Sequence, residues 1–216
     1  MHRCKICGSE SLEHIYNEKS NSNYYRCKVC EFIFQDENEI VSLEREKGVY
    51  DLHNNSFESE GYVKMFENFI DKAINPFIKS KQNALDYGCG PGPVLSKILE
   101  NQGWDVNIYD PIYNFENNDY KNYKYSLITS TEVFEHFSNP VKELEKISKL
   151  LDKDGILAIM TLLSPKNKDK FKDWWYTRDI THISFYSSKT LYLLGKMFGL
   201  EMIYNDNKRL ITFKKL

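Results

Sequence analysis

Residues 84–93 read ALDYGCGPGP, and this stretch decides the fold because it places an acid and three glycines directly after an apolar run. Gly88, Gly90 and Gly92 permit a tight turn and let a ligand approach main-chain N–H groups without interference from a Cβ atom. A helix that begins near Pro93 would point the positive end of its dipole at that ligand. The stretch therefore predicts a strand–turn–helix junction that binds a nucleotide-like cofactor, although such a turn also occurs without a ligand.

The segments around this turn alternate between strand-like and helix-like patterns. Expected strands cover 83–87, 106–109, 126–130 and 156–162, and expected helices cover 94–102, 140–151 and 188–198. This alternation predicts an α/β fold with a doubly wound, Rossmann-like parallel sheet. Two further runs in 199–216, joined by a polar turn, predict a closing antiparallel hairpin. Only about fifteen residues follow the second expected strand before the next one, so any strand and helix between them must be abbreviated.

A second acid supports a cofactor site. The run WDVNIYDP ends near Asp110, about twenty residues beyond the glycines, where ribose hydroxyls are bound in such folds. The glycine spacing departs from GxGxxG, and D-x-G-C-G-P-G instead resembles motif I of the class I S-adenosylmethionine-dependent methyltransferases. That resemblance implies that the glycine turn takes the methionine and ribose portion of the cofactor, that Asp86 orients its amino end and that Asp110 holds the ribose diol. By match of position these roles fall on Asp86, Gly88, Gly90 and Asp110. The full set of expected cofactor-binding residues adds Tyr87, Cys89, Pro111, Thr131 and Glu132.

Four of the five cysteines occur as two pairs near the amino terminus, Cys4-x-x-Cys7 and Cys27-x-x-Cys30. This spacing is typical of two zinc knuckles that face one another, and four thiolates complete a closed tetrahedral shell. We therefore expect a structural Zn²⁺ in a zinc ribbon over residues 1–46. Disulfides are the alternative, which a reducing cytosol disfavours.

The charge of this ribbon bears on its partner. Residues 1–46 contain six lysines and arginines against nine aspartates and glutamates, whereas a nucleic-acid-binding finger normally has a basic excess. A packing, lid or substrate-docking role is therefore expected, and nucleic acid is an unfavoured partner. The aromatic residues Tyr24, Tyr25, Phe32 and Phe34 are interpreted as a small core, with a base-stacking platform as the alternative.

Residues 47–83 are predicted to form a helical bridge or lid. Apolar side chains recur at helical spacing from Tyr62 to Ala73, which predicts an amphipathic helix. Helices in this position often cover the cofactor in class I methyltransferases, so His53 and Tyr62 are substrate-binding candidates, together with Tyr50 and Asn54. A helix that only packs on the sheet edge is the alternative. The methyltransferase domain itself is expected to cover 84–216.

Two segments carry the catalytic candidates. In TEVFEH, residues 131–136, Glu132, Glu135 and His136 lie at the carboxyl end of an expected strand, where such sheets bind ligands, although Glu135 or His136 can equally cap the next turn.

The segment 173–187, DWWYTRDITHISFYS, follows the last expected parallel strand. His182 is the expected general base, because imidazole titrates near neutral pH, and Asp179 would orient it. A histidine that is only packed in the loop is the alternative. Trp174, Trp175 and Tyr176 are expected either to stack on a flat substrate or to anchor the loop on the sheet.

The composition limits the class of protein. A chain of 216 residues with 41% hydrophobic content can bury one ordinary domain and a small appendage. The net charge is −2, and no apolar run reaches the roughly 20 residues of a membrane span, so neither a polyanion nor a membrane is an expected partner. The amino terminus lacks the apolar core of a signal peptide, which favours the cytoplasm.

Taken together, the cysteine pairs, the glycine turn, TEVFEHF and WWYTRDITHISFYS resemble a group of small bacterial class I methyltransferases with an amino-terminal zinc ribbon. The resemblance implies an S-adenosylmethionine-dependent methyltransferase but names no substrate. The leading hypothesis is methyl transfer to a small metabolite by in-line displacement. It does not identify the acceptor atom or the oligomeric state. An RNA or protein acceptor recruited by the ribbon, and a module that senses the cofactor without catalysis, are the alternative functions.

Overall fold

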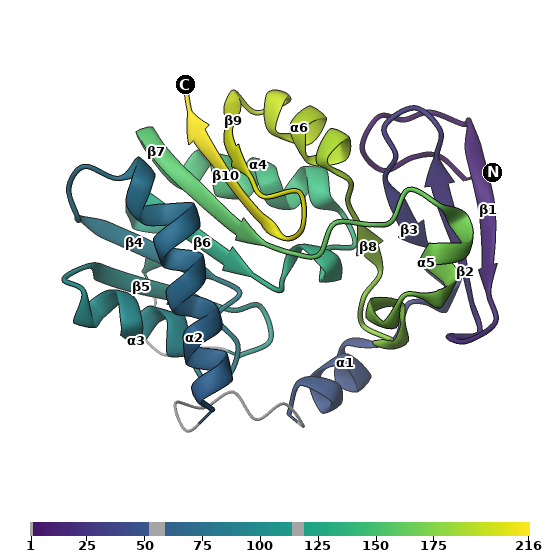
Figure 1. Cartoon of the computed structure of the whole chain (residues 1–216), viewed down its shortest axis with the longest axis horizontal. Coiled ribbons are helices and arrows are strands. Elements are labelled where there is room, and N and C mark those ends of the chain that lie inside the picture. Colours follow the sequence, from purple (N-terminus) through teal and green to yellow (C-terminus); the bar gives the residue numbers. More distant parts are fainter. Residues whose placement is uncertain (1, 52–58, 114–118) are drawn as a thin grey trace.

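Two β-sheets organise the chain, a small one at its amino-terminal end and a larger one that carries the carboxyl-terminal strands (Figure 1). The computed structural model describes residues 2–51, 59–113 and 119–216. The small sheet has the strand order β1-β2-β3-β8, and the large sheet has the order β5-β4-β6-β7-β10-β9.

The strands of the large sheet are β4 (Asn83–Tyr87), β5 (Asp105–Tyr109), β6 (Tyr125–Thr131), β7 (Leu151–Met160), β9 (Leu200–Asn205) and β10 (Leu210–Lys215). The first four are parallel to one another, whereas β10 runs antiparallel to both β7 and β9. The predicted parallel sheet and its closing hairpin are therefore confirmed. In the described part of the segment between β5 and β6, only a 3-10 turn occurs, at Tyr120–Asn122, so the sheet gains no strand there.

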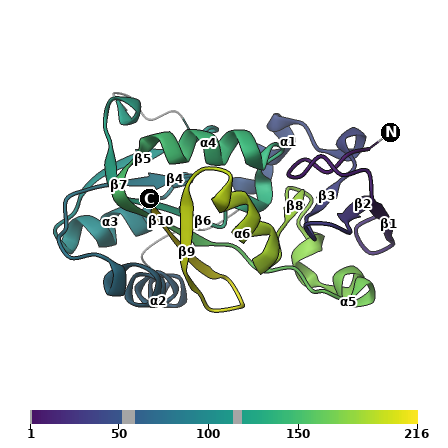
Figure 2. The same cartoon turned by 90° about the horizontal axis from the view of Figure 1, so that it is seen from above.

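Helices cover both faces of this sheet (Figure 2). One face packs against α2 (Glu60–Phe69) and α3 (Val94–Asn101), and the other packs against α4 (Pro140–Leu150) and α6 (Ser188–Lys196). Successive strand residues alternate between the two sides: Leu127 joins the α2–α3 cluster and Ile128 joins the α4–α6 cluster. This arrangement confirms the predicted cover on both faces. Of the described residues, none belongs to a helix long and apolar enough to cross a membrane.

The described residues between the small sheet and β4 are largely helical, and α1 crosses the predicted boundary between 46 and 47. Helix α1 (Leu43–Tyr50) buries none of its residues, whereas α2 buries Phe66 and Phe69. The chain then continues through a π-helical turn, Ile70–Ile74, and a 3-10 turn, Asn75–Phe77. The apolar spacing beyond Tyr62 thus reflects packing on the sheet.

Strand β7 differs from its predicted bounds. Residues 152–155, which lie between the expected helix 140–151 and the expected strand 156–162, belong to β7, and this strand already pairs with β6 at Leu151 and shifts register after Tyr125. A Cβ atom at Gly155 would lie 2.8 Å from the carbonyl oxygen of Tyr125, so glycine allows the two strands to approach here. The DKDG sequence therefore forms an irregular strand start and not a separate turn.

The small sheet combines strands from two segments that are far apart in the sequence. Its strands β1 (Leu12–Asn17), β2 (Ser22–Cys27) and β3 (Ile33–Gln35) come from the predicted ribbon, but β8 (Ser184–Phe185) comes from the aromatic segment. Ile33 pairs with Phe185 in an antiparallel register. The division into 1–46, 47–83 and 84–216 stays a prediction, and β8 crosses it.

One apolar cluster joins the ribbon to the large sheet. Phe32 and Phe34, both nearly inaccessible, share this cluster with Phe134, Tyr186 and Leu157. Tyr24 is equally buried in a neighbouring cluster with Phe171 and Phe185. The interpretation of these ribbon aromatics as core residues is therefore confirmed, and Tyr25 lies at the edge of that core, half-buried and stacked on His2.

Candidate active site

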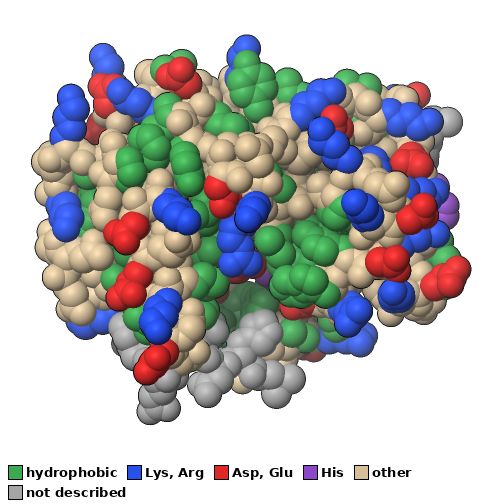
Figure 3. All heavy atoms as spheres, in the orientation of Figure 1, with side chains coloured by type: hydrophobic (Ala, Val, Ile, Leu, Met, Phe, Trp, Pro, Cys, Tyr) green, Lys and Arg blue, Asp and Glu red, His purple; other side chains and the backbone are tan. Residues whose placement is uncertain are grey.

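A cavity of about 580 Å³ opens where the parallel strands β4, β5 and β6 end. Its wall includes the glycine turn after β4, the ends of β5 and β6, helices α1 and α2, and residues from 175 to 182. Figure 3 shows a hollow bordered by hydrophobic side chains on the face seen in Figure 1. The cavity thus lies at the carboxyl edge of the sheet, where ligands of open α/β folds bind.

The glycine turn is held by backbone hydrogen bonds. Gly88 and Gly90 have φ angles of 86° and 66°, and a Cβ atom at Gly88 would lie 2.4 Å from Val133. The N–H groups of Gly88 and Cys89 donate to the Tyr109 carbonyl at 2.7 and 3.2 Å. Gly88 and Gly90 therefore allow the shape of the turn, and Gly88 also allows its close approach to Val133. The N–H groups of Gly88 and Cys89 are already bonded within the protein.

Asp86 lies one residue before the end of β4, beneath the turn, and is almost fully buried. Its carboxylate accepts hydrogen bonds from Ser96 Oγ at 2.8 Å and Thr129 Oγ1 at 2.9 Å. Burial raises the pKa of Asp86 to about 6, although these two hydroxyls lower it. Asp86 therefore links β4 to α3 and β6 while bordering the cavity.

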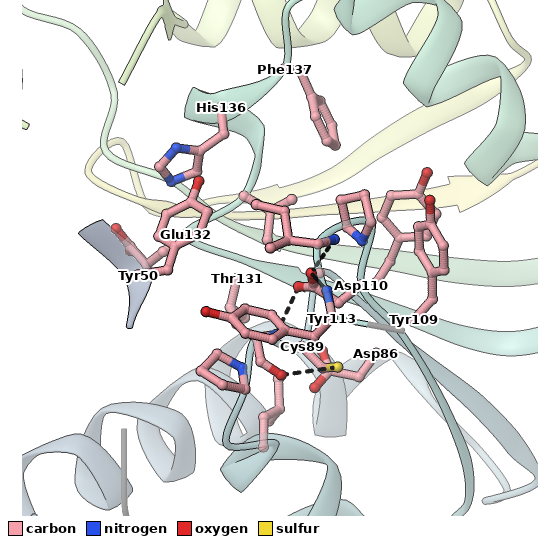
Figure 4. A pocket seen from close by; sticks show the side chains of 18 of the residues that line it. Tyr50, Asp86, Cys89, Tyr109, Asp110, Tyr113, Thr131, Glu132, His136 and Phe137 are labelled. Carbon is pink, nitrogen blue, oxygen red and sulfur yellow. Dashed lines mark hydrogen bonds between the residues drawn. The ribbon is translucent and has the colours of Figure 1, made fainter. Parts of the chain in front are cut away.

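Asp110 follows β5 and organises the opposite side of the turn (Figure 4). One carboxylate oxygen accepts from the Gly90 N–H at 2.9 Å, and the other accepts from Ile112 and Tyr113 N–H at 2.8 and 3.1 Å. Because a carboxylate offers about four lone-pair positions, one further hydrogen bond to a ligand remains possible. Asp110 is thus preorganised by the backbone, and it lines the cavity.

The other predicted cofactor residues also border this cavity. Tyr87 lines the cavity, and its hydroxyl donates to the Glu143 carboxylate at 2.7 Å. Cys89 lines the cavity, and burial raises the pKa of its thiol. Pro111 and Thr131 line the cavity at the ends of β5 and β6.

The TEVFEH segment places two acids around one tyrosine hydroxyl. The Tyr176 hydroxyl donates to Glu135, which is buried, and lies 3.0 Å from Glu132 Oε2. Glu135 also accepts from Thr161 Oγ1 at 2.9 Å. Burial and the neighbouring Glu132 raise the pKa of Glu135 well above its ordinary value. Glu132 itself has φ 53°, and its Oε1 atom is buried without a hydrogen-bond partner among the described residues.

Two histidines face each other at this end of the cavity, with ring centroids 4.8 Å apart. His136 Nδ1 lies 3.0 Å from the Thr181 carbonyl, and His182 Nδ1 lies 2.8 Å from the Tyr176 carbonyl. A carbonyl only accepts, so each neutral imidazole carries its proton on Nδ1 and has Nε2 as its basic nitrogen.

Asp179 completes this group. Its Oδ2 lies 3.7 Å from His182 Nε2, and its Oδ1 accepts from Thr181. Burial would raise the pKa of Asp179, but His182, Thr181 and His136 together lower it. Asp179 therefore remains charged beside the imidazole.

Only some of the remaining substrate-binding candidates line the cavity. Trp175 is 59% exposed and lines the cavity, whereas Trp174 is absent from its wall and packs with Phe171 and Phe185. Tyr62 lines the cavity, and burial, with Asp86 and Glu132 adding to it, raises its pKa to about 12. His53 and Asn54 lie outside the described residues.

Two lining residues, Glu46 and Tyr113, had no specific signal in the sequence. Glu46 reaches the cavity from α1, where it accepts a hydrogen bond from the hydroxyl of Tyr50 at 2.7 Å. The Tyr113 hydroxyl donates to Asp51 at 2.7 Å and joins the loop after β5 to the end of α1. Tyr50 itself was a candidate from the sequence, and it lines the cavity.

The sulfur atoms of the four paired cysteines converge in the predicted ribbon. Cys4 Sγ lies 3.4 Å from Cys30 Sγ, Cys7 Sγ lies 3.5 Å from Cys27 Sγ, and all four lie within 4.8 Å of one another. Each pair closes a matching turn, in which Gly8 N–H bonds Cys4 O and Glu31 N–H bonds Cys27 O. Gly8 and Glu31 have φ angles of 71° and 68°, so the two knuckles have the same backbone form.

Comparisons with known proteins agree with this fold. A family model described as a methyltransferase domain matches residues 62–205. A comparison with curated proteins gives no match.

Solved structures with the same fold include methyltransferases. Magnesium protoporphyrin IX methyltransferase from Synechocystis PCC 6803, with bound SAH, has a TM-score of 0.52 at 14% identity, covering 80% of this chain and 94% of that one. The mitomycin 7-O-methyltransferase has a TM-score of 0.56 at 13% identity, covering 82% and 61%. Human N-acetylserotonin methyltransferase in complex with SAM has a TM-score of 0.52 at 14% identity, covering 74% and 57%. At these identities the likeness concerns the fold.

Proposed function

Because the chain belongs to the methyltransferase domain family, we propose that it transfers a methyl group from S-adenosylmethionine to a small-molecule acceptor. One observation carries this proposal: a single cavity joins the glycine turn and Asp110 to His136, His182 and Asp179. Its volume of about 580 Å³ lies within the range of roughly 300–1,000 Å³ that small-molecule sites have. A donor and a small acceptor can therefore meet in one enclosure.

The residues present fit the cofactor. The turn at Gly88 and Gly90 would border its methionine and ribose portion, and Asp110 would hold the ribose through its remaining lone pair. The buried Oε1 of Glu132, with Arg209 Nη2 4.0 Å away, offers an acceptor that lacks a hydrogen bond among the described residues. S-adenosylmethionine supplies a methyl group already activated by positive sulfur, so the protein must mainly orient the acceptor and remove a proton.

His182 is proposed as the base. The Tyr176 carbonyl fixes its Nδ1 proton, which leaves Nε2 to accept a proton from the acceptor. Asp179 Oδ2, at 3.7 Å, stabilises the resulting imidazolium. His136 has the same Nδ1 arrangement and is the second candidate.

Titration calorimetry with S-adenosylmethionine and S-adenosylhomocysteine tests the donor half. Asp110→Asn should weaken binding about tenfold or more, since loss of a charged hydrogen bond costs roughly 1.5–3 kcal/mol. Asp105→Asn, at the exposed start of the same strand, is the matched control and should bind normally. Unchanged binding in Asp110→Asn would refute the ribose assignment.

Labelled-methyl transfer into fractionated cell extract tests catalysis. His182→Ala should lose most transfer while it keeps its cofactor affinity, and His14→Ala, an exposed ribbon histidine, should retain full transfer. Cofactor binding without transfer in any fraction would favour a sensing module. Transfer into RNA or protein fractions alone would replace the small-molecule acceptor.

A structural zinc ion in the cysteine cluster is the second part of the proposal. A tetrahedral site with Zn–S bonds of about 2.3 Å needs sulfur separations of about 3.8 Å. The pairs Cys4–Cys30 and Cys7–Cys27, at 3.4 and 3.5 Å, are close to that spacing. Four cysteines leave no position for water or substrate, so the ion would stabilise the ribbon.

A further inference from the structure

The charges of the cavity wall are strongly unbalanced. Six carboxylates line it, whereas Lys146 is the only lysine or arginine among the described lining residues. Lys146 is already paired with Glu143 at 2.6 Å. Away from that pair, the described wall contributes no lysine or arginine; Glu132 has Arg209 Nη2 at 4.0 Å from outside the wall, and Asp179 has His182 beside it.

Two of these acids lie at the acceptor end and come from segments far apart in the sequence. Glu46 reaches the cavity from α1, and Asp179 follows η6 (Trp175–Arg178). No ion pair joins Glu46 to a lysine or arginine in the described ranges, and Asp179 pairs with His182. Burial raises the pKa of Glu46, and the nearby Asp110 and Asp179 raise it further. A bound cation would relieve this crowding of negative charge.

Aromatic rings complete the same end of the cavity. Tyr50 lies beside His136, with ring centroids 5.2 Å apart, and Figure 4 shows both on the side of Glu132, away from Tyr109 and Asp110. Tyr62 and Trp175 also line the wall. Aromatic rings attract cations as well as flat apolar groups, so this wall suits an aryl-alkyl cation.

We propose that the methyl acceptor is an aryl-alkyl amine that enters as an ammonium ion, and that Glu46 and Asp179 select it. This inference rests on the proposed methyltransferase function and names the substrate class. A phenolate or carboxylate acceptor would meet the same acids and be repelled. A neutral alcohol would gain nothing from them.

The proton and electron balance of the transfer fits these groups. The ammonium gives one proton to His182 Nε2, and the nitrogen lone pair then forms the N–CH₃ bond while the electrons of the C–S bond return to sulfur. The positive charge thus passes from sulfur to nitrogen, inside a wall whose acids compensate it. Asp179, at 3.7 Å from Nε2, holds the proton on the imidazole until it leaves to solvent.

Calorimetry on the full-length protein saturated with S-adenosylhomocysteine tests the selection. The probes are matched pairs, phenethylamine with phenethyl alcohol and tryptamine with tryptophol. At neutral pH at least one amine should bind about tenfold more tightly than its alcohol, which corresponds to one favourable charge contact in a partly buried site.

Glu46→Gln should lower the affinity for that amine about tenfold and leave the alcohol and S-adenosylhomocysteine affinities unchanged. Glu44→Gln, an exposed residue of the same helix, is the control and should bind as the unmodified protein does. Equal affinities, a preference for the alcohols, no binding of any probe, or an unaltered amine preference in Glu46→Gln would overturn the inference. Failure to bind S-adenosylhomocysteine would instead refute the proposed function on which it rests.

Discussion

Tyr176 connects the polar groups at one end of the cavity. Its hydroxyl lies between Glu132 and Glu135, and its carbonyl fixes His182. The Tyr176 hydroxyl can donate only one hydrogen bond, although two carboxyl groups lie beside it. The raised pKa of Glu135 favours its protonated form at this position. A protonated Glu135 supplies the second hydrogen and spares the site two adjacent buried charges.

Removing this hydroxyl should therefore destabilise the fold. Tyr176→Phe leaves buried carboxyl oxygens with fewer hydrogen-bond partners, and we expect it to lose about 1–3 kcal/mol of unfolding free energy, measured by urea denaturation. Tyr192→Phe is the control, because Tyr192 is 47% exposed and should lose almost nothing. Equal stability of the two variants would contradict the hydrogen bonds of Tyr176 with Glu132 and Glu135.

Asp86 should give the protein a pH-dependent stability. Its pKa rises from 3.8 to about 6 on folding, so the folded state favours the protonated acid. Such a group contributes its stability fully below the unfolded pKa and loses that contribution as the pH rises through the folded value. Between pH values of about 4 and 7, the unmodified protein should lose up to about 3 kcal/mol relative to Asp86→Asn.

Unfolding curves without cofactor across that pH range check this prediction. Ser96 and Thr129 bond the same carboxyl group, so Asp86→Asn also changes these hydrogen bonds. The test therefore uses only how the stability difference between the two proteins changes with pH. A difference that stays constant with pH, or that changes in the opposite direction, would show that folding does not raise the pKa of Asp86.

At the scale of elements, β3 holds the segment that carries His182. Gln35 N–H donates to the Ile183 carbonyl at 2.9 Å, directly beside His182, and β3 pairs with β8 at the next residues. The ribbon therefore supports the position of the proposed base.

Zinc analysis of cysteine variants tests the ribbon. The purified chain and Cys89→Ser should each contain one zinc ion, because Cys89 lies in the glycine turn and outside the cluster. Cys27→Ser should lose most of the metal, since a structural site needs its four ligands. Atomic absorption gives the stoichiometry, and a full zinc content in Cys27→Ser would disprove the four-cysteine site.

Helices α1 and α2 should differ in their dynamics. Helix α1 buries no residue and is joined to the rest of the site by polar contacts such as Tyr113 with Asp51. Helix α2 buries Phe66 and Phe69. We expect the α1 amides to exchange with deuterium much faster than those of α2 in the free protein, and to slow when S-adenosylhomocysteine binds. Equal protection of the two helices, measured by mass spectrometry, would contradict this.

At the scale of the whole molecule, local patterns predicted most of the fold. Glycines after an apolar run, a polar turn between two late strands and paired cysteines each determine structure within a few residues, and each was recognisable. Strand β8 was not predictable, because two residues carry no periodicity and their pairing depends on β3, about 150 residues away. Glu46 was missed for a related reason: α1 has no apolar face, so only the path of the chain places it at the cavity.

The shared core predicts how the molecule unfolds. Phe32 and Phe34 of the ribbon pack in one cluster with Phe134, Tyr186 and Leu157, and β8 ties the two sheets together. Neither sheet can lose its structure without exposing apolar surface of the other, which costs roughly 25 cal/mol for each Å². The whole chain should therefore unfold in one transition, with calorimetric and van 't Hoff enthalpies that agree. A chelator should move this single transition to lower temperature, whereas two separate transitions, with only the first sensitive to the chelator, would mean that the ribbon is an independent unit.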